Sequence, residues 1–360
     1  EISILAHNPA PFWELEAEFE SGDAKWSARW ERSGHKDDPE RPELKAHRII
    51  EASEKEMLEG VLKAEGDFSV SQTDRNSTEK PPLNFDLTSL QREANNMWSW
   101  SAKRTLSVAQ ELYDSHKLTT YPRTDSRFLP EDMMESISKT IRQLGAQDDL
   151  NKHSQRLIDN GLKNVKRNFD NSKVSDHYAI IPTGKIPPSG LSSDAAKLYD
   201  LISRQFLSSF HPEAIWKVEK RIATKQGQNF VKEARSLSTP GWRAVRPKKQ
   251  NLPEGWGVLP SNPGPATMSS HDFKEEKTKP PGRLKEAGLL RLMEHAGKKI
   301  DDEELAAAMK GKGLGTPATR ADTIEKLISR EFIGRGRGGS LRATPHGIKM
   351  IDILRKIPVE

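Results

Sequence analysis

Alternation of apolar and charged side chains predicts strands in the first part of the chain. Residues 11–70 mix aromatic and charged positions, and within residues 12–19 apolar and acidic side chains alternate with a period of two. Polar residues then cluster over residues 71–80. Because Pro81 and Pro82 rule out a helix across that point, we expect a domain boundary there.

The pattern becomes helical from Thr88 onward. Apolar residues recur at steps of three and four between residues 88 and 118, and Thr88 is a suitable N-cap. Further helices are predicted over residues 130–144 and 193–210, the second capped by the polar residues that begin at Ser192. These helices form one block that follows the first β region.

The strand pattern returns over residues 214–245 and includes residues 242–245, so the helical block is inserted into a split β region. Residues 247–283 are rich in Pro, Gly, Ser and Lys, which favours a long connection or an irregular edge over a packed element.

Helices are predicted again near the end of the chain. Leu289, Leu292 and Met293 form one short apolar face, and residues 321–333 form another.

Composition removes several classes of function. The 360 residues suffice for about two or three domains. The absence of cysteine excludes disulfides, thiolate metal sites and thiol nucleophiles, and makes the reducing cytoplasm the expected compartment. No apolar run approaches the roughly 18 to 20 residues of a membrane span, so we expect a soluble protein with no membrane partner. The net charge of +5 permits nucleic-acid binding without requiring it.

The start of the chain indicates part of a longer protein. The first residue is Glu1 rather than methionine, and residues 1–4 have the pattern of a strand or helix already under way.

The segment most informative about chemistry is Thr-Thr-Tyr-Pro-Arg-Thr-Asp-Ser at residues 119–126, just past a strongly amphipathic helix. Pro122 fixes its own φ and moves Tyr121 out of the helical region, so the phenol can project from an extended turn. The fork of donors on Arg123 suits a phosphate. Taken alone, however, a tyrosine near an arginine is more often structural than catalytic, and the same holds for a single histidine such as His177.

Further motifs appear along the chain in a fixed order. They are Leu-Thr-Ser-Leu-Gln at residues 87–91, Lys-Arg-Thr-Leu at 103–106, Ser-Asp-His-Tyr-Ala-Ile-Ile-Pro-Thr at 175–183, Lys-Thr-Lys-Pro-Pro at 277–281 and Gly-Leu-Gly-Thr-Pro-Ala-Thr-Arg-Ala at 313–321. With the octet around Tyr121, this series resembles the type IA DNA topoisomerases, nearest their topoisomerase III branch.

The resemblance implies both a reaction and its residues. In the family a tyrosine attacks a phosphorus of single-stranded DNA and leaves a 5′-phosphotyrosyl bond and a free 3′-hydroxyl, so Tyr121 is the expected nucleophile. Arg123 is expected to hold the scissile phosphate and His177 to donate to it. No ATP is required, and no Walker loop is present. The expected DNA-binding residues are Gln91, Lys103, Thr316, Thr319 and Arg320.

The implied fold is an α+β multidomain arch. Its domains are expected at residues 1–85 and 206–282 for the two parts of a β-rich gate domain, 86–205 for the helical domain that carries Tyr121 and His177, and 283–360 for part of a helical base. Single-stranded DNA is the expected partner, with a helicase or a single-strand-binding protein as further candidates.

The family also uses Mg²⁺, held by a glutamate and an Asp-x-Asp-x-Glu cluster of an N-terminal Toprim domain. That cluster has no counterpart in this sequence. The acidic runs at residues 37–38, 148–149 and 301–304 have the spacing of loop or helix-start charge. We therefore expect rejoining and relaxation to be severely impaired for this chain alone.

Several segments keep a structural alternative. Thr316 can simply cap a helix that begins at Pro317, and such a helix start can also seat a phosphate. The Gly- and Arg-rich residues 334–339 fit a flexible basic hairpin tip. Trp98 and Trp100 fit core packing better than base stacking.

The two Lys-Pro-Pro triplets, at residues 80–82 and 279–281, each separate a β-like stretch from a helical one. Linker composition alone explains them equally well.

Two other functions remain for the whole chain. A tyrosine recombinase or type IB enzyme is the weaker rival, because Tyr121 lies too early in the chain. A catalytically silent module that binds single-stranded DNA is the second alternative.

Overall fold

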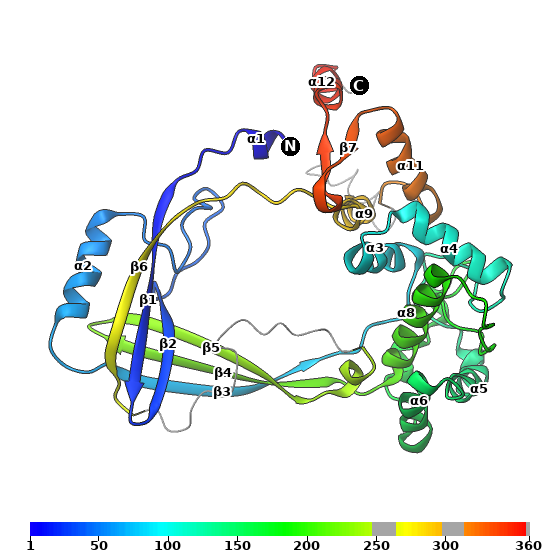
Figure 1. The fold of residues 1–360 in the computed structure, drawn as a ribbon, viewed down its shortest axis with the longest axis horizontal. Coiled ribbons are helices and arrows are strands. Elements are labelled where there is room, and N and C mark those ends of the chain that lie inside the picture. Colours follow the sequence, from blue (N-terminus) through cyan, green and yellow to red (C-terminus); the bar gives the residue numbers. More distant parts are fainter. Residues whose placement is uncertain (247–263, 297–312, 358–360) are drawn as a thin grey trace.

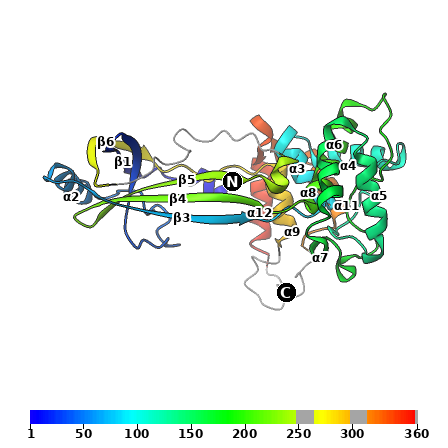
Figure 2. The same ribbon diagram turned by 90° about the horizontal axis from the view of Figure 1, so that it is seen from below.

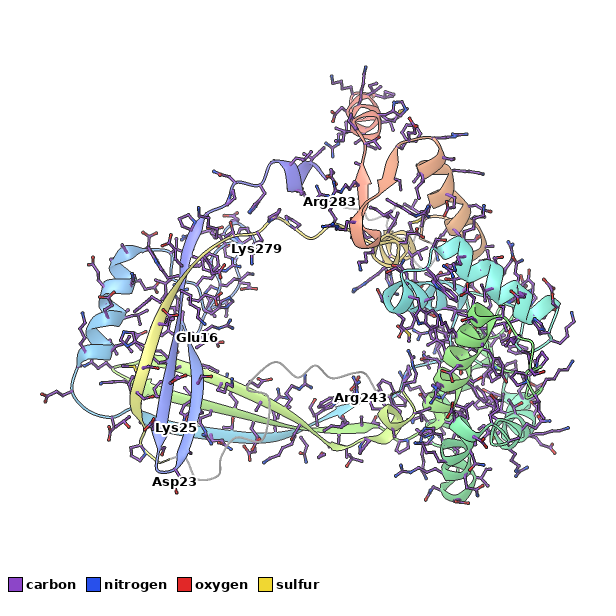
Figure 3. The ribbon with its side chains drawn as sticks, in the orientation of Figure 1. Glu16, Asp23, Lys25, Arg243, Lys279 and Arg283 are labelled. Atoms are coloured by element: carbon purple, nitrogen blue, oxygen red, sulfur yellow. The ribbon has the colours of Figure 1, made fainter. Side chains whose placement is uncertain are left out.

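The chain is bent into a closed arch, with a sheet on one side and helices on the other. The computed structural model describes residues 1–246, 264–296 and 313–357. Figure 1 looks through the open centre of the arch, and Figure 2 shows it from below. Among the described residues, the side chains drawn in Figure 3 do not fill that centre.

A sheet of six strands forms one side of the arch, in the order β3-β4-β5-β2-β1-β6, and its neighbouring strands are antiparallel. The strands are β1 (Pro11–Ser21), β2 (Ala24–Glu31), β3 (Ser69–Glu79), β4 (Ala214–Lys225), β5 (Gln228–Thr239) and β6 (Thr267–Lys277). Leu15, Ala17 and Phe19 of β1 are buried on one face, as the predicted period of two requires. Phe19 packs edge-on against Phe68 and Phe230 at centroid distances of 5.0 and 5.6 Å.

Two sequence predictions about this sheet were wrong. Residues 267–277, predicted to belong to a long connection or an irregular edge, form strand β6, paired with β1 along its length, while residues 247–263 of that predicted connection lie outside the described residues. The polar residues 71–79 belong to strand β3, which ends just before the boundary expected at Pro81. Both are edge strands with largely exposed side chains, so backbone pairing alone places them and no apolar pattern marks them. Residues 242–245, predicted as strand, lie in or beside the 3₁₀ helix Gly241–Ala244.

The helical block comprises residues 87–210 and is inserted between β3 and β4. Its helices are α3 (Leu87–Trp98), α4 (Ala102–Asp114), α5 (Met134–Leu144), α6 (Asp148–Asn160), α7 (Val165–Asn168) and α8 (Ser193–Phe210). Short 3₁₀ turns lie at Glu131–Met133 and Asn171–Lys173. A separate helix, α2 (Ala52–Lys63), covers the sheet.

Polar caps define where these helices begin. Ser192 caps α8 as predicted, by accepting a hydrogen bond from the backbone of Ala195 at 3.1 Å. Helix α3 is capped by Asp86 instead of Thr88, because the Asp86 carboxylate accepts a 2.6 Å bond from the backbone of Ser89. Thr88 is buried inside the first turn. Within the described ranges, no helix is both long and apolar enough to cross a bilayer.

The base comprises the described residues from 283 onward. Its elements are α9 (Glu286–Glu294), α11 (Pro317–Ser329), β7 (Ile333–Arg335), the 3₁₀ turn Arg337–Gly339, β8 (Leu341–Ala343) and α12 (Pro345–Leu354). The N-terminal helix α1 (Ile2–Leu5) lies beside it. Residues 333–343 form a hairpin, as predicted for the basic Gly-rich segment.

Two details of the base differ from the prediction. The apolar face of α9 uses Leu290 and Met293, while Leu292 is 40% exposed. Helix α11 begins at Pro317 with Thr316 as its cap, in a capping box with Thr319, as the structural alternative predicted; it ends at Ser329, before the end of the predicted apolar face at residue 333.

The sheet meets its neighbours at two joints, and a Lys-Pro-Pro triplet lies at each, at residues 80–82 after β3 and at residues 279–281 after β6. At the joint with the helical block, Glu79 receives two bonds from Arg243 at 2.5 and 2.6 Å and one from the indole of Trp216 at 2.9 Å. At the joint with the base, Arg283 pairs with Glu1 at 2.8 Å. Figure 3 labels Arg243 and Arg283 at these joints.

The third contact of the arch is a seam where α3 and α4 meet α9 and α11. The chain passes from block to base only by way of the sheet, so no covalent connection crosses this seam directly. Its apolar part is a small cluster made of Ala102, Leu290, Met293, Ala321 and Ile324. Polar bonds complete it, among them the backbone of Ala102 to the Glu286 carboxylate at 2.8 Å.

A buried histidine pair in the helical block makes the stability of the chain depend on pH. His211 is 1% exposed, and its ring lies 6.2 Å from that of His153. Burial, and then the neighbouring His153, lower the pKa of His211 from 6.5 to about 4. The unfolded chain therefore takes up this proton first, so the contribution to stability is complete above pH 6.5 and is lost as the pH falls toward 4.

We expect His211 to account for about 2 kcal/mol of lost unfolding free energy between neutral pH and pH 5. Urea unfolding curves measured across that range check this. His211→Asn should flatten this part of the pH profile, whereas His346→Gln, at an exposed position, should leave it in place. Equal pH profiles for the parent and His211→Asn would contradict the assignment.

Candidate active site

Tyr121 is positioned by an antiparallel pairing between two irregular segments. The chain leaves α4 through Lys117, whose φ of +54° is left-handed, and then runs beside residues 179–183. The backbone of Thr120 donates to the carbonyl of Ile181 at 3.0 Å, and the Thr120 hydroxyl accepts from the amide of Ile181 at 3.0 Å. The two segments are thus joined immediately before Tyr121.

The small polar residues that follow Tyr121 join the same two segments again. The Thr124 hydroxyl donates to the carbonyl of His177 at 2.9 Å. The Ser126 hydroxyl donates to the carbonyl of Lys173 at 2.8 Å, and Asp125 accepts from the hydroxyl of Ser175 at 3.0 Å. These contacts hold the histidine segment against the tyrosine segment.

Tyr121 and His177 come together as a result. Their ring centroids lie 4.3 Å apart with an angle of 44° between the planes. Tyr113 of α4 packs edge-on against Tyr121 at 5.4 Å. Tyr121 is half-buried and His177 is exposed, so the phenol is held among rings without being enclosed in the core.

A pocket of about 530 Å³ opens beside this pair. Tyr121 and His177 line it together with Tyr113, Tyr178, Lys117 and Lys185. Burial raises the pKa of Tyr178, which keeps its phenol protonated. The pocket therefore combines a half-exposed phenol, an imidazole and two ammonium groups.

Arg123 does not share this pocket. Its guanidinium is directed at Gln110 of α4, whose side-chain oxygen, with the amide turned to suit its neighbours, accepts from Nη2 at 3.1 Å and from Nε at 3.3 Å. Within the described residues, Arg123 makes no hydrogen bond to Tyr121 or His177. The structure thus brings together two of the three predicted catalytic residues.

The predicted DNA-binding residues fall into two groups. Lys103, Thr316 and Thr319 are exposed at the starts of α4 and α11. Gln91 is fully buried, with its amide donating to the carbonyl of Ala102 at 3.1 Å. Arg320 is 4% exposed, lies in the seam and donates to the Thr88 hydroxyl at 2.9 Å.

In this closed form of the arch, Gln91 and Arg320 hold helices together, and their contact with DNA stays a prediction. Buried side chains that hold helices together have no surface left for a DNA backbone. Burial also lowers the pKa of Arg320, and Glu294 and Asp86 act against that effect.

The tryptophans near the end of α3 follow the core-packing alternative. Trp100 is 4% exposed, its ring lies 4.7 Å from that of Trp98, and the guanidinium of Arg104 lies 4.7 Å from its centroid. Trp98 is partly buried and packs against the core of the helical block.

No metal site accompanies the pocket in residues 1–246, 264–296 and 313–357, where no three His, Asp or Glu side chains gather closely enough to hold an ion. Residues 148–149 open α6, as predicted for helix-start charge. Asp37 pairs with Lys45 at 2.8 Å in a loop, as predicted for loop charge. Residues 301–304 lie outside the described residues. The groups present do not fit a magnesium site, so no step of the chemistry below passes through a metal.

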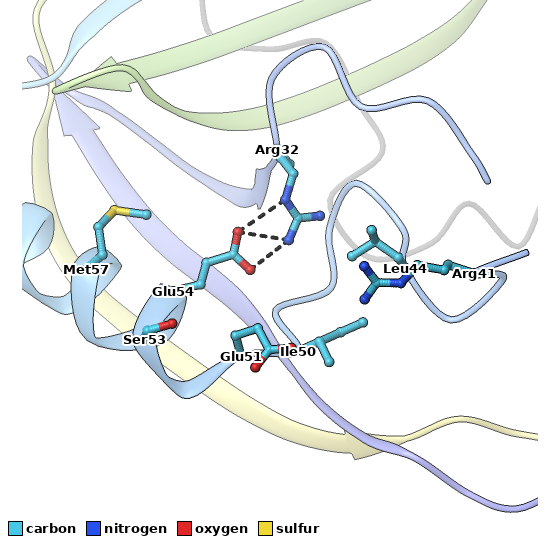
Figure 4. A pocket seen from close by; sticks show the side chains of 8 residues that line it. All are labelled: Arg32, Arg41, Leu44, Ile50, Glu51, Ser53, Glu54 and Met57. Atoms are coloured by element: carbon cyan, nitrogen blue, oxygen red, sulfur yellow. Dashed lines mark hydrogen bonds and ion pairs between the residues drawn. The ribbon is translucent and has the colours of Figure 1, made fainter.

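A second pocket, of about 480 Å³, lies between α2 and the loop that follows β2 (Figure 4). Its central cation, Arg32, is paired with Glu54 of α2 at 2.7 and 2.8 Å. Because that ion pair neutralises the cation, the pocket beside Tyr121 is the better candidate for chemistry on a phosphate.

Comparisons with known proteins identify the family of the chain. A family model described as DNA topoisomerase matches residues 1–359. The DNA topoisomerase 3 of Bacillus licheniformis is 34% identical over 316 residues, which are 85% of this chain and 43% of that protein. The DNA topoisomerase 3 of Bacillus subtilis is 36% identical over 283 residues, which are 76% of this chain and 39% of that protein. The chain thus spans about two fifths of the length of these relatives.

Among solved structures, the full-length topoisomerase I from Thermotoga maritima in a monoclinic crystal form matches with a TM-score of 0.65 and 22% identity. The match covers 99% of this chain and 53% of that chain. This likeness confirms the predicted fold class, an α+β arch with a split β region and inserted helices. With the family model and the curated relatives, it shows that the chain belongs to the type IA DNA topoisomerase family.

Proposed function

We propose that this chain carries the DNA-cleaving tyrosine of a type IA topoisomerase, and that Tyr121 forms a transient bond with single-stranded DNA. The observation that carries the proposal is the placement of Tyr121 in a pocket, half-exposed and 4.3 Å from His177, on a segment fixed from both sides. A phenol kept for packing alone would not need a pocket lined by an imidazole and two ammonium groups.

The proposed reaction exchanges one ester for another. The phenolic oxygen of Tyr121 attacks a backbone phosphorus, the 3′ oxygen leaves as a hydroxyl after gaining a proton, and the 5′ phosphate stays on the tyrosine. The reverse attack by the 3′-hydroxyl restores the strand. Since each step replaces one phosphate ester with another, neither ATP nor another energy source is consumed.

The neighbours of Tyr121 supply charge and proton transfer in this proposal. A phenol is almost wholly protonated at neutral pH, so a base or a cation must assist its attack. His177 is close enough to accept that proton or to donate to a phosphate oxygen. Arg123 would exchange its bond with Gln110 for one with the scissile phosphate, whose equatorial oxygens gain negative charge during transfer.

The activity of the whole protein is a further part of the proposal. Strand passage requires the arch to open, and the seam supports this role because no covalent connection crosses it directly. Relaxation or decatenation would follow, with Mg²⁺ held by a Toprim region outside this chain. We also propose that residues 1–85 and 206–282 act as the gate domain, 86–205 as the tyrosine domain and 283–360 as part of the base. Lys103, Thr316 and Thr319 would contact the DNA backbone.

A cytoplasmic location and an association with a helicase or a single-strand-binding protein remain proposals. The absence of cysteine supports the first, and the family's work on single strands supports the second. A silent single-strand-binding module is the less favoured alternative, since the curated relatives are topoisomerases.

Covalent trapping tests the proposed reaction. The chain, fused to a Toprim region of the family and supplied with Mg²⁺, is incubated with a single-stranded oligonucleotide and denatured with detergent. We expect a DNA adduct that carries a label placed on the 3′ end of the oligonucleotide, because the 5′-phosphate side stays on the tyrosine. The absence of any adduct, or an adduct that carries the 5′-end label, would contradict the proposal.

A further inference from the structure

The pocket beside Tyr121 extends along the paired segments toward two lysines. Lys117 and Lys185 both line it, and hydrogen bonds from Thr183 hold their segments together. The amide of Thr183 donates to the carbonyl of Leu118 at 2.9 Å, and its hydroxyl donates to the carbonyl of Lys117 at 2.8 Å. Both ammonium groups therefore lie on one edge of the pocket, formed by the two hydrogen-bonded segments that carry Lys117 and Lys185; we call this edge the rim.

This rim lies along the strand direction from Tyr121. Lys117 precedes Tyr121 by four residues, and an extended chain rises about 3.3 Å per residue, so the lysine backbone lies within roughly 13 Å of the tyrosine backbone. Between them, Tyr113 contributes an aromatic wall, and the ammonium of Lys117 lies 5.3 Å from its ring centroid. The one carboxylate that lines the pocket, Asp176, is adjacent in sequence to His177, at the Tyr121 end.

We propose that this pocket binds the DNA segment on the 5′-phosphate side of the cleaved bond, with Lys117 and Lys185 neutralising the phosphates next to the one on Tyr121. The inference rests on the proposed function and adds a substrate site to it. Tyr113 offers its ring to the adjoining base. Single-stranded nucleic acid is bound by this combination of cations along the backbone and aromatic faces for the bases.

Two features of the chain support this occupant. The nucleotide that carries the 5′ phosphate is tethered to Tyr121 after cleavage, so it must lie beside that ring, where the pocket is. Lys117 holds a left-handed backbone conformation that favours glycine or asparagine, yet a lysine stands there, with its side chain exposed at the pocket.

Because the proposed site lies on the helical block, it has a role when the seam opens. Tyr121, Lys117 and Lys185 all belong to the same block, on one side of the seam. When the seam opens, cations on this block would keep the tethered segment aligned, while the 3′-hydroxyl segment stays with the other side of the arch.

Binding of a 5′-phosphorylated single-stranded oligonucleotide, followed by fluorescence anisotropy at several salt concentrations, tests the site. The variant is Lys117→Asn with Lys185→Gln, because asparagine tolerates the left-handed backbone at residue 117. We expect about tenfold weaker binding at 0.1 M salt, with a log-log salt slope shallower by about 1.4, which is 0.7 for each of two lost phosphate contacts. Lys185→Gln alone leaves residue 117 untouched and should give about half that change in slope.

A matched pair of exposed lysines on the same block provides the control. Lys139→Asn with Lys197→Gln removes the same charge from α5 and α8, where neither lysine lines the pocket, and should leave the slope nearly unchanged. An equal loss in this control would mean that only net charge matters, and it would overturn the site. So would an unchanged slope in the pocket variant.

Neutral phosphates in the oligonucleotide show whether the lysines act where proposed. Methylphosphonates at the linkages that follow the 5′ phosphate should weaken binding to the parent chain and have little further effect on the pocket variant. Equal weakening in both proteins would overturn the proposal.

The adduct assay on the Toprim fusion separates this inference from the proposed reaction. Adduct formation together with lysine-independent binding would overturn the site and keep Tyr121 as the nucleophile. Lysine-dependent binding without any adduct would support a DNA-binding pocket and reject the reaction.

Discussion

Tyr121→Phe is expected to abolish the covalent DNA adduct and, with it, any relaxation by the assembled enzyme. The change removes only the nucleophilic oxygen and keeps the ring, its contact with His177 at 4.3 Å and its edge-on packing with Tyr113 at 5.4 Å. Folding and noncovalent DNA binding should therefore stay near those of the parent. Denaturing gels of the adduct, with anisotropy on the same samples, measure both quantities.

Tyr199→Phe is the matched control for this substitution. It also removes one phenolic oxygen from the helical block, but Tyr199 is buried in α8, and its hydroxyl accepts from Gln147 and donates to the carbonyl of Lys185, both at 3.4 Å. The adduct should persist in this variant. Adduct formation by Tyr121→Phe at the level of Tyr199→Phe would show that another group attacks the DNA.

The order of the elements could be read from the sequence where side-chain patterns are strong. Strand β1 and the amphipathic helices that follow Asp86 can be recognised from the spacing of their apolar residues, because each element buries one face or stripe. Strands β3 and β6 could not be read in this way, since edge strands keep their side chains in water and are placed by backbone pairing. Their pairing partners lie far away along the chain, beyond any local pattern.

The candidate site was only partly readable for a related reason. The octet around Tyr121 and the motif of His177 are recognisable as sequence, and the pairing through Thr120 and Thr124 explains why those small polar residues accompany them. The sequence does not reveal that Gln91 is buried against the backbone of Ala102, which only tertiary packing determines.

The sequence did not identify Lys117 and Lys185 as site residues, because two exposed lysines form no recognisable motif. Thr183 brings their segments together only in the fold, through its bonds to residues 117 and 118. The left-handed backbone at Lys117 is likewise invisible in a lysine, whereas a glycine there would have signalled a turn.

The seam should depend on Glu286 more than on any surface ion pair. This carboxylate is 3% exposed; Oε2 accepts from the free amide at the start of α4, Ala102, at 2.8 Å, and Oε1 accepts from Arg335 at 2.7 and 3.0 Å. Glu286→Ala leaves the buried amide unpaired and separates α4 from the Arg335 side chain. We expect the closed seam to lose about 3 kcal/mol, which is more than a hundredfold in the population of open arches.

Distance measurements across the seam can detect this change directly, because the chain has no cysteine and two introduced thiols would be the only labelling sites. Spin labels at Ser107→Cys on α4 and Lys326→Cys on α11, both exposed, should give one distance in the parent and a second, longer distance in Glu286→Ala.

Glu294→Ala is the control on the same helix. Its 3.6 Å pair with Arg92 also crosses the seam, but both side chains are about 30% exposed, so its loss should cost the closed seam about 1 kcal/mol or less. A single unchanged distance in Glu286→Ala would mean that the apolar cluster and the other polar bonds of the seam, such as that of Arg320 to Thr88, keep the arch closed without Glu286.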